Sequence, residues 1–144
     1  MFGCVHFNFS VKGKEIALTF DDGPHPEFTT QILDILKERE IKATFFVIGW
    51  NVEHSPEITK RIIEEGHDIG VHSYTHSWMY KNNLEEISSC KKAIEEVTGV
   101  SPTLFRPPYG FRIPATLNAA KKNDLINVMW NIITGDWKIS KSAE

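Results

Sequence analysis

Apolar residues along this chain form short continuous runs that alternate with segments in which apolar residues recur every three or four positions. The short runs are rich in β-branched and aromatic residues, which is typical of buried strands. The segments with helical spacing predict amphipathic helices, each with one apolar face. The predicted strands are 15–20, 43–48, 68–72, 103–106 and 126–133. The predicted helices are 31–36, 56–65, 83–97 and 114–122.

Residues at the predicted helix boundaries indicate where these helices begin and end. Thr29 or Thr30 can cap the first helix, because a threonine hydroxyl can accept a bond from a free amide of the first turn. Ser55 can cap the second helix in the same way, and Gly66 is expected to end it. Asn123 can supply the left-handed residue that ends the fourth helix.

Strands that alternate with helices indicate a parallel α/β sheet covered by helices. The chain has 144 residues, enough for one domain with one core. A closed (β/α) barrel usually needs about 200 residues or more. Two architectures therefore remain: an open doubly wound sheet, and a barrel that is incomplete in this chain.

The composition of the chain argues against several classes of function. The net charge is −3, and Lys and Arg are mixed with Asp and Glu, so there is no basic stripe for nucleic acid or an anionic membrane. No apolar run approaches the roughly 20 residues that span a bilayer. The first residues lack the basic start and apolar centre of a signal peptide. Cys4 and Cys90 can form one disulfide, but two reduced thiols are the preferred interpretation.

Polar residues that are unusual for a buried sheet come directly after the predicted strands. The carboxyl ends of parallel strands form one rim, where α/β proteins place their active sites. We therefore expect these residues to converge although they lie far apart in the sequence. They are Asp21, Asp22, His72, His76, Arg106, Tyr109, Asp136 and Trp137.

Two of these groups have the chemistry of a metal site. Asp21 and Asp22 repel each other unless a cation or an arginine compensates, although an Asp-Gly-Pro sequence also forms an ordinary solvated turn. His72 and His76 are four residues apart and can meet one ion on a helical turn or a tight loop. The alternative is one exposed histidine and one that caps a helix. His67 precedes its strand and is interpreted as structural or solvent-facing.

The other two groups suggest transition-state and substrate contacts. Prolines 107 and 108 fix the backbone after Arg106, which suits an oxyanion-stabilising amide at Tyr109. The alternative is a turn with a surface arginine. Trp137 can be a core aromatic residue or a face on which a sugar stacks.

The four groups occur in one order: Thr19-Phe20-Asp21-Asp22-Gly23-Pro24, His72-x-x-x-His76, Arg106-Pro107-Pro108-Tyr109-Gly110 and Asp136-Trp137. This combination resembles the polysaccharide deacetylase family, also called carbohydrate esterase family 4 or the NodB homology domain. The resemblance runs from about residue 15 to residue 137. It implies a distorted, incomplete (β/α) barrel over residues 15–144, truncated at its C-terminal strands, with residues 1–14 as an N-terminal extension.

The resemblance also implies an activity, the metal-dependent removal of N-acetyl or O-acetyl groups from a polysaccharide such as chitin, peptidoglycan or xylan. Asp22, His72 and His76 would hold the metal, zinc first, with cobalt and nickel as alternatives. Asp21 would be the general base, and Arg106 would pair with it. Members of the family act at the cell envelope or outside the cell, which is the location that we expect.

Further roles follow from the same resemblance. The backbone amide of Tyr109 would stabilise the oxyanion, and Asp136 belongs with the catalytic residues. Pro107, Tyr109 and Trp137 would contact the substrate, an acetylated polysaccharide.

The chain departs from the family pattern at two positions. The general acid is usually a histidine after the Asp-Trp pair, but no histidine follows His76. Ile133 stands where the family usually has another aspartate. Two alternatives to the deacetylase therefore remain: a glycan- or metal-binding remnant that lacks the general acid, and a hydrolase of a small non-peptide C–N bond.

Overall fold

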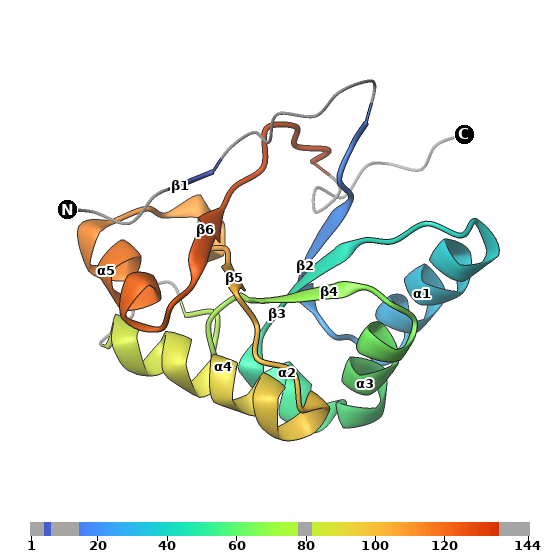
Figure 1. Cartoon of the computed structure of the whole chain (residues 1–144), viewed down its shortest axis with the longest axis horizontal. Helices are drawn as coiled ribbons and strands as arrows, with labels where there is room; N and C mark the ends of the chain where they lie inside the picture. Colours follow the sequence, from blue (N-terminus) through green and yellow to red (C-terminus); the bar gives the residue numbers. More distant parts are fainter. Residues whose placement is uncertain (1–4, 7–14, 78–81, 136–144) are drawn as a thin grey trace.

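The computed structural model of the chain describes residues 5–6, 15–77 and 82–135. Its centre is a parallel sheet of six strands in the order β1-β6-β5-β4-β3-β2 (Figure 1). The strands are β1 Val5–His6, β2 Thr19–Gly23, β3 Thr44–Val47, β4 Asp68–Val71, β5 Leu104–Phe105 and β6 Ile126–Val128. Because β1 and β2 are the two edges, the described strands form an open, incomplete barrel.

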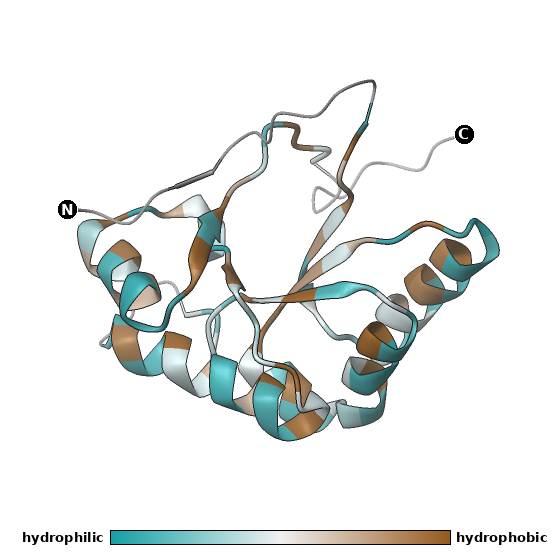
Figure 2. Ribbon diagram, in the orientation of Figure 1, coloured by the Kyte–Doolittle hydropathy of each residue, from teal (hydrophilic) through white to brown (hydrophobic). Residues whose placement is uncertain are grey.

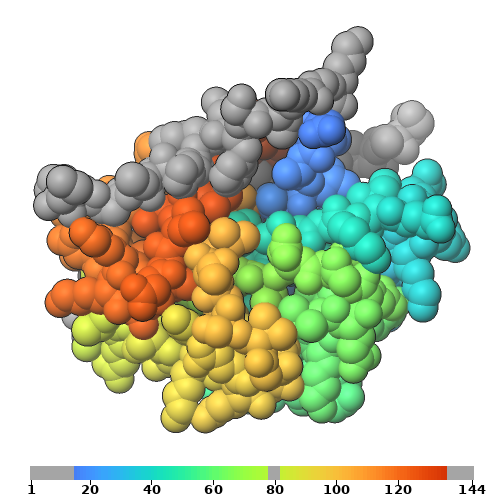
Figure 3. Space-filling view, viewed as in Figure 1, coloured from blue at the N-terminus to red at the C-terminus, as the bar shows by residue number. Residues whose placement is uncertain are grey.

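The helices follow one another along one side of the curved sheet, in the order α1, α3, α2, α4, α5 from right to left in Figure 1. They are α1 Phe28–Glu38, α2 Gly49–His54, α3 Pro56–Glu64, α4 Asn83–Thr98 and α5 Pro114–Lys122. A short 3-10 helix, Pro108–Gly110, follows β5. In the space-filling view, the segments coloured green, gold and red-orange lie side by side on the face shown (Figure 3). Within the described part of the chain, no helix is both long and apolar enough to cross a membrane.

Two predicted strands differ from those in the structure by more than one residue at an end. The strand predicted at 15–20 is β2, which starts at Thr19 because Thr19 pairs with Thr44, the first residue of β3. The strand predicted at 126–133 is β6, which ends at Val128, the residue that pairs with His6 of β1. The predicted residues that lie outside these two strands include Ile16 and Ile132, whose side chains are 79% and 72% exposed.

The segment expected to be an N-terminal extension contributes a strand. Val5 pairs with Asn127 and His6 with Val128, so β1 covers the edge of β6. The sequence Val5-His6-Phe7-Asn8-Phe9 alternates apolar and polar residues, a sign of a strand that the sequence-based prediction did not use.

Two of the predicted helix caps are wrong, and a third has the predicted residue without the predicted bond. Helix α1 begins at Phe28, and the Thr29 hydroxyl accepts a bond from the His25 amide before the helix. Ser55 precedes α3 as expected, but its side chain makes no capping bond. At the end of α5 the left-handed residue is Asp124, with φ 58°, rather than Asn123. The left-handed Gly66 after α3 is confirmed.

The hydrophobic core lies between the sheet and the helices. Leu33 of α1, Ile62 of α3 and Ile94 of α4 are fully buried in one cluster with Phe45 and Val71 of the sheet. Figure 2 shows the same division, with apolar colouring on the central strands and helices that carry both colours. Burial of this apolar surface holds the helices on the sheet and so fixes the rim at the carboxyl ends of its strands.

Gly70 leaves the space that the Phe46 ring occupies. A Cβ at Gly70 would lie 2.7 Å from Cδ1 of Phe46 and 3.2 Å from Cβ of Leu104. The Phe46 ring in turn lies 4.0 Å from the guanidinium carbon of Arg106. The absence of a side chain at Gly70 therefore helps to place an arginine at the rim.

We predict that Gly70→Ala lowers the free energy of unfolding by about 1–3 kcal/mol, because the added methyl group collides with the Phe46 ring in a closely packed sheet. Chemical denaturation measures this loss. Thr103→Ala, at an exposed position just before β5, is the control and should change stability by less than about 0.5 kcal/mol. Equal stabilities of the two variants would show that the sheet can accommodate the methyl group.

Candidate metal centre and active site

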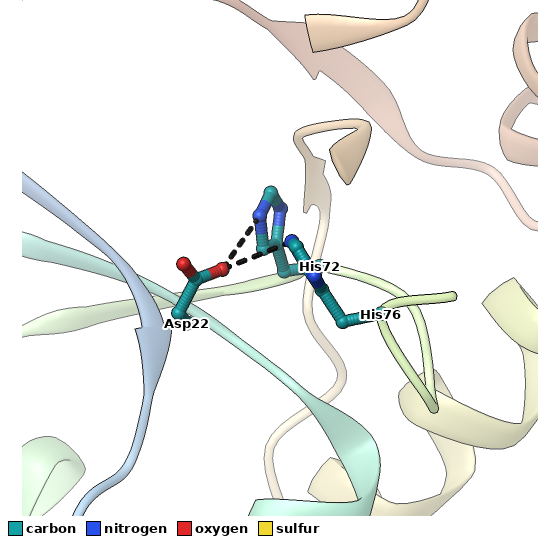
Figure 4. A group of neighbouring side chains, drawn as sticks. All are labelled: Asp22, His72 and His76. Atoms are coloured by element: carbon teal, nitrogen blue, oxygen red, sulfur yellow. Dashed lines mark ion pairs between the residues drawn. The ribbon is translucent and has the colours of Figure 1, made fainter. Parts of the chain in front are cut away.

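Three side chains from two strand ends meet at the rim of the sheet. Oδ1 of Asp22 lies 3.3 Å from Nε2 of His72 and 3.1 Å from Nε2 of His76 (Figure 4). The three potential ligand atoms lie within 4.8 Å of one another. One carboxylate oxygen and two imidazole nitrogens at this separation are a donor set that suits zinc and leaves positions open for water or substrate.

A local irregularity of β2 directs Asp22 toward the histidines. The pairing of β2 with β3 shifts register between Asp21 and Gly23, and Asp22 has a φ of 70°. Such a bulge turns one residue out of the alternating pattern of the strand. Two adjacent aspartates can therefore face different partners.

The ring of His72 is held in one orientation. The ring is buried, and its Nδ1 lies 2.6 Å from the backbone oxygen of Arg106. Because a carbonyl oxygen can only accept, Nδ1 carries the hydrogen and donates it. When the ring binds an ion, Nε2 offers its lone pair on the side of Asp22, as a metal ligand requires. Without an ion, a ring with a hydrogen on each nitrogen donates from Nε2 to Asp22.

His76 reaches the same point through a tight loop, not a helical turn. Ser73 and His76 have φ values of 70° and 54°. The backbone N–H of His76 donates to the Ser73 hydroxyl at 3.0 Å. The spacing of four residues between the histidines allowed a helical turn or a tight loop, and the structure has the tight loop.

The histidines affect the ionisation of Asp22. The hydrogen bond from His72, and after it the bond from His76, hold the pKa of Asp22 well below its usual range, against a smaller opposing effect of burial. Asp22 is therefore ionised at neutral pH, the form that binds a cation.

The other aspartate pairs with a buried arginine. Nη1 of Arg106 donates to Oδ1 of Asp21 at 2.6 Å and to the Thr19 hydroxyl at 2.8 Å. Nε of Arg106 donates to the backbone oxygen of Val128 at 3.2 Å. Arg106 is 2% exposed, so the alternative of a surface arginine in a turn is wrong. Burial lowers the pKa of Arg106, and Asp21 opposes this shift, so the guanidinium stays charged.

Ile133 does not take part in this arrangement. Its side chain is 56% exposed. The guanidinium of Arg106 is nevertheless held by Asp21, Thr19 and Val128. The pairing of Arg106 with Asp21 therefore forms without a carboxylate at position 133.

The segment after β5 places Tyr109 beside the histidines. Pro107 and Pro108 are buried, and Tyr109 has a φ of 56° and is half exposed. The ring of Tyr109 lies 4.7 Å from the ring of His76, and its hydroxyl is 3.4 Å from the backbone oxygen of His76. Tyr109 thus lies at the rim next to the three potential ligands.

Of the remaining candidates, Asp136 and Trp137 are outside the described residues. His67 is buried, and its Nδ1 accepts a bond from the Ala43 amide at 3.2 Å, which confirms its structural interpretation. Cys90 is a free, buried thiol.

Two contributors to the site have no role in the sequence-based predictions. Thr19 accepts a bond from Arg106, although its motif suggested only a strand position. Asn51, in the unpredicted helix α2, donates from Nδ2 to the backbone oxygen of Asp22 at 2.9 Å. In the sequence, the only indication of this role was that Asn51 follows soon after the end of a predicted strand.

Several known proteins are similar to this chain in sequence and in structure. The sequence profile of the polysaccharide deacetylase family matches residues 9–128. A peptidoglycan-N-acetylglucosamine deacetylase of Bacillus cereus is 44% identical over 128 residues, which cover 86% of this chain and 46% of that protein. A solved peptidoglycan N-acetylglucosamine deacetylase superposes with a TM-score of 0.80 at 41% identity, over 85% of this chain and 59% of that one.

A third protein with this fold is a pseudoenzyme of carbohydrate esterase family 4 from Bacillus anthracis. It superposes with a TM-score of 0.79 at 30% identity, over 86% of this chain and 46% of that one. Likeness in fold alone therefore does not distinguish an active member from an inactive one.

The α/β sheet with a rim of histidines and aspartates defines a protein of the carbohydrate esterase type. The chain belongs to the polysaccharide deacetylase family, as its four motifs predicted. Its fold is an incomplete barrel that superposes on part of the solved structures of that family. The chain spans about half the length of the Bacillus cereus deacetylase that it matches.

We predict that Arg106→Met lowers the free energy of unfolding by roughly 3 kcal/mol, because Asp21, Thr19 and Val128 lose a buried charged donor at once. Equilibrium unfolding in urea measures the change. Arg39→Met, at an exposed position after α1, is the matched control and should shift stability by less than about 0.5 kcal/mol. A loss no larger than that of the control would contradict a central role for Arg106.

Proposed function

We propose that this chain carries the active site of a metal-dependent deacetylase that removes N-acetyl groups from glucosamine residues of peptidoglycan or a similar polysaccharide. The observation that carries the proposal is the convergence of Asp22, His72 and His76 beside an aspartate that pairs with Arg106. The similarity to peptidoglycan-N-acetylglucosamine deacetylases supports the substrate class. It also supports a location at the cell envelope or outside the cell.

The three ligands fit a divalent cation in number and type. The imidazole nitrogens of His72 and His76 and an ionised carboxylate at Asp22 favour zinc, with cobalt and nickel as alternatives. Such an ion, when bound, lowers the pKa of a water molecule toward about 7 and polarises the acetyl carbonyl.

Asp21 is the proposed general base. Its partner Arg106 holds the carboxylate by a charge-assisted bond of 2.6 Å. Because the carboxylate is 28% exposed, water can reach it. Asp21 can then take a proton from the attacking water, while its neighbour Asp22 remains a ligand.

The Tyr109 amide is the proposed donor to the oxyanion that forms on the acetyl oxygen. The rigid Pro107-Pro108 segment fixes the backbone on which that amide lies. Pro107, Tyr109 and Trp137 are proposed to contact the sugar, and Asp136 is proposed to act with the catalytic residues. For Asp136 and Trp137 this stays a prediction from the sequence, as does the extent of the domain, 15–144.

A second candidate function is binding of glycan or metal without turnover. The similarity to a pseudoenzyme of carbohydrate esterase family 4 supports this candidate.

Acetate release from N-acetylglucosamine oligomers and from peptidoglycan tests the proposal. The protein is loaded with zinc, and an excess of chelator provides the control. Release that the chelator abolishes supports the deacetylase, and release from small amides alone indicates a hydrolase of another C–N bond. Zinc binding without any release favours the binding function.

Two substitutions distinguish the role of the general base from the role of a metal ligand. Asp21→Asn should reduce acetate release by about 10²-fold or more and leave zinc affinity within a few-fold of the original, because the amide cannot accept the proton of water. His72→Ala should lose zinc as well, because one of three ligands is gone. Isothermal titration with zinc and an acetate assay measure both properties, and full activity of Asp21→Asn would refute the assignment of the base.

A further inference from the structure

We propose that Glu86 is a positioning residue for the metal site, which it supports by fixing the loop between His72 and His76. This inference rests on the proposed function, since it assigns Glu86 a part in holding the cation. Glu86 lies in the first turn of α4 and is not itself one of the three ligands.

The carboxylate of Glu86 binds the loop at three points. Oε2 accepts the backbone N–H of Tyr74 at 3.1 Å and that of Thr75 at 2.9 Å. Oε1 accepts the hydroxyl of Thr75 at 2.8 Å. One side chain thus binds Tyr74 and Thr75, two of the three residues between the histidines. Charge-assisted bonds of this kind are stronger than neutral ones.

Helix α2 holds the opposite side of the same loop. The backbone N–H of Gly49 donates to the oxygen of Ser73 at 3.0 Å, and that of Trp50 donates to the oxygen of Tyr74 at 3.0 Å. The loop carbonyls are therefore bound by α2 and the loop amides by Glu86. This leaves the backbone between the two ligands little freedom to move.

The loop needs such support because its conformation is unfavourable by itself. Ser73 and His76 are both left-handed, which costs a residue with a side chain on the order of 1 kcal/mol. A relaxed loop would rotate His76 away from Asp22. Contacts that favour this one conformation therefore keep the two histidine nitrogens close together before an ion arrives.

Helix α4 is itself anchored to the sheet. Ile87 and Cys90 are buried, and Sγ of Cys90 donates to the backbone oxygen of Val47 at the end of β3. Burial raises the pKa of Cys90 to about 12, so the thiol keeps its hydrogen. Glu86 lies one turn before Cys90 on a helix whose place is fixed, so its carboxylate can hold the loop in position.

If Glu86 positions the metal ligands, its removal weakens metal binding in the folded protein. If Glu86 only stabilises the fold, its removal leaves the metal affinity of the folded protein unchanged. We predict that Glu86→Ala weakens zinc binding by about 10–100-fold, the usual effect of removing a residue that orients a ligand. The d–d spectrum of the cobalt-loaded protein should change as well, because the geometry around His76 changes. Competition with a chromophoric chelator measures zinc affinity under conditions in which circular dichroism shows every variant to be folded.

Two further variants serve as controls. Glu86→Gln should remain within about threefold of the original affinity, because its amide oxygen can accept both backbone N–H groups and its NH₂ group can donate to the Thr75 hydroxyl. This variant also removes the charge, so retention of affinity excludes a purely electrostatic effect. Glu96→Ala removes an equal charge from the exposed side of α4, where Glu96 pairs with Lys92 at 3.4 Å, and should have no effect.

The outcomes separate this inference from the proposed function. Wild-type zinc affinity and an unchanged cobalt spectrum in Glu86→Ala would overturn the inference and leave the metal site intact. Failure of the unaltered protein to bind zinc would overturn the proposed function itself. If Glu86→Ala does not fold, Glu86→Asp replaces it, since its shorter side chain keeps the charge but withdraws the carboxylate from the loop. Full affinity in a folded Glu86→Asp would then contradict the inference.

Discussion

The buried guanidinium of Arg106 is the interaction on which the rest of the site depends. A charge that is 2% exposed must be compensated by partners within reach. Asp21 and Thr19 of β2 and Val128 of β6 provide those partners, and the Phe46 ring of β3 lies against the guanidinium carbon at 4.0 Å. Arg106 itself follows β5, so one side chain connects strands that are distant in the sequence.

The backbone of the same residue connects the proposed base to the proposed metal site. Its carbonyl accepts the Nδ1 hydrogen of His72 and so directs Nε2 toward Asp22. The bulge in β2 completes this division of roles, because it lets Asp21 face Arg106 while Asp22 faces the histidines. Two carboxylates that are adjacent in sequence therefore have different partners, Arg106 for Asp21 and the two histidines for Asp22.

Patterns of neighbouring residues predicted much of this structure. The apolar runs located five of the strands, because buried parallel strands differ in composition from the turns that follow them. The rule that such strands end at one rim brought Asp22, His72 and His76 together before any distance was known. These predictions depend on local composition and on general properties of parallel sheets.

The features that the sequence did not predict depend on contacts in space. Helix α2 has six residues, too few to show a helical period, yet its amides hold the loop at Ser73. Glu86 resembles any acidic residue in the first turn of a helix until the loop that it binds is known. Strand β6 ends at Val128, although apolar residues continue beyond it in the sequence.

A crystal structure of the zinc-loaded protein, with the ion located by anomalous scattering, would show directly which residues bind the metal. We predict one zinc ion at about 2.0–2.2 Å from Nε2 of His72, Nε2 of His76 and a carboxylate oxygen of Asp22. We also predict that Asp21 remains bound to Arg106 and does not coordinate the ion. Zinc held by Asp21, or by residues away from this rim, would show that the ligands are assigned wrongly.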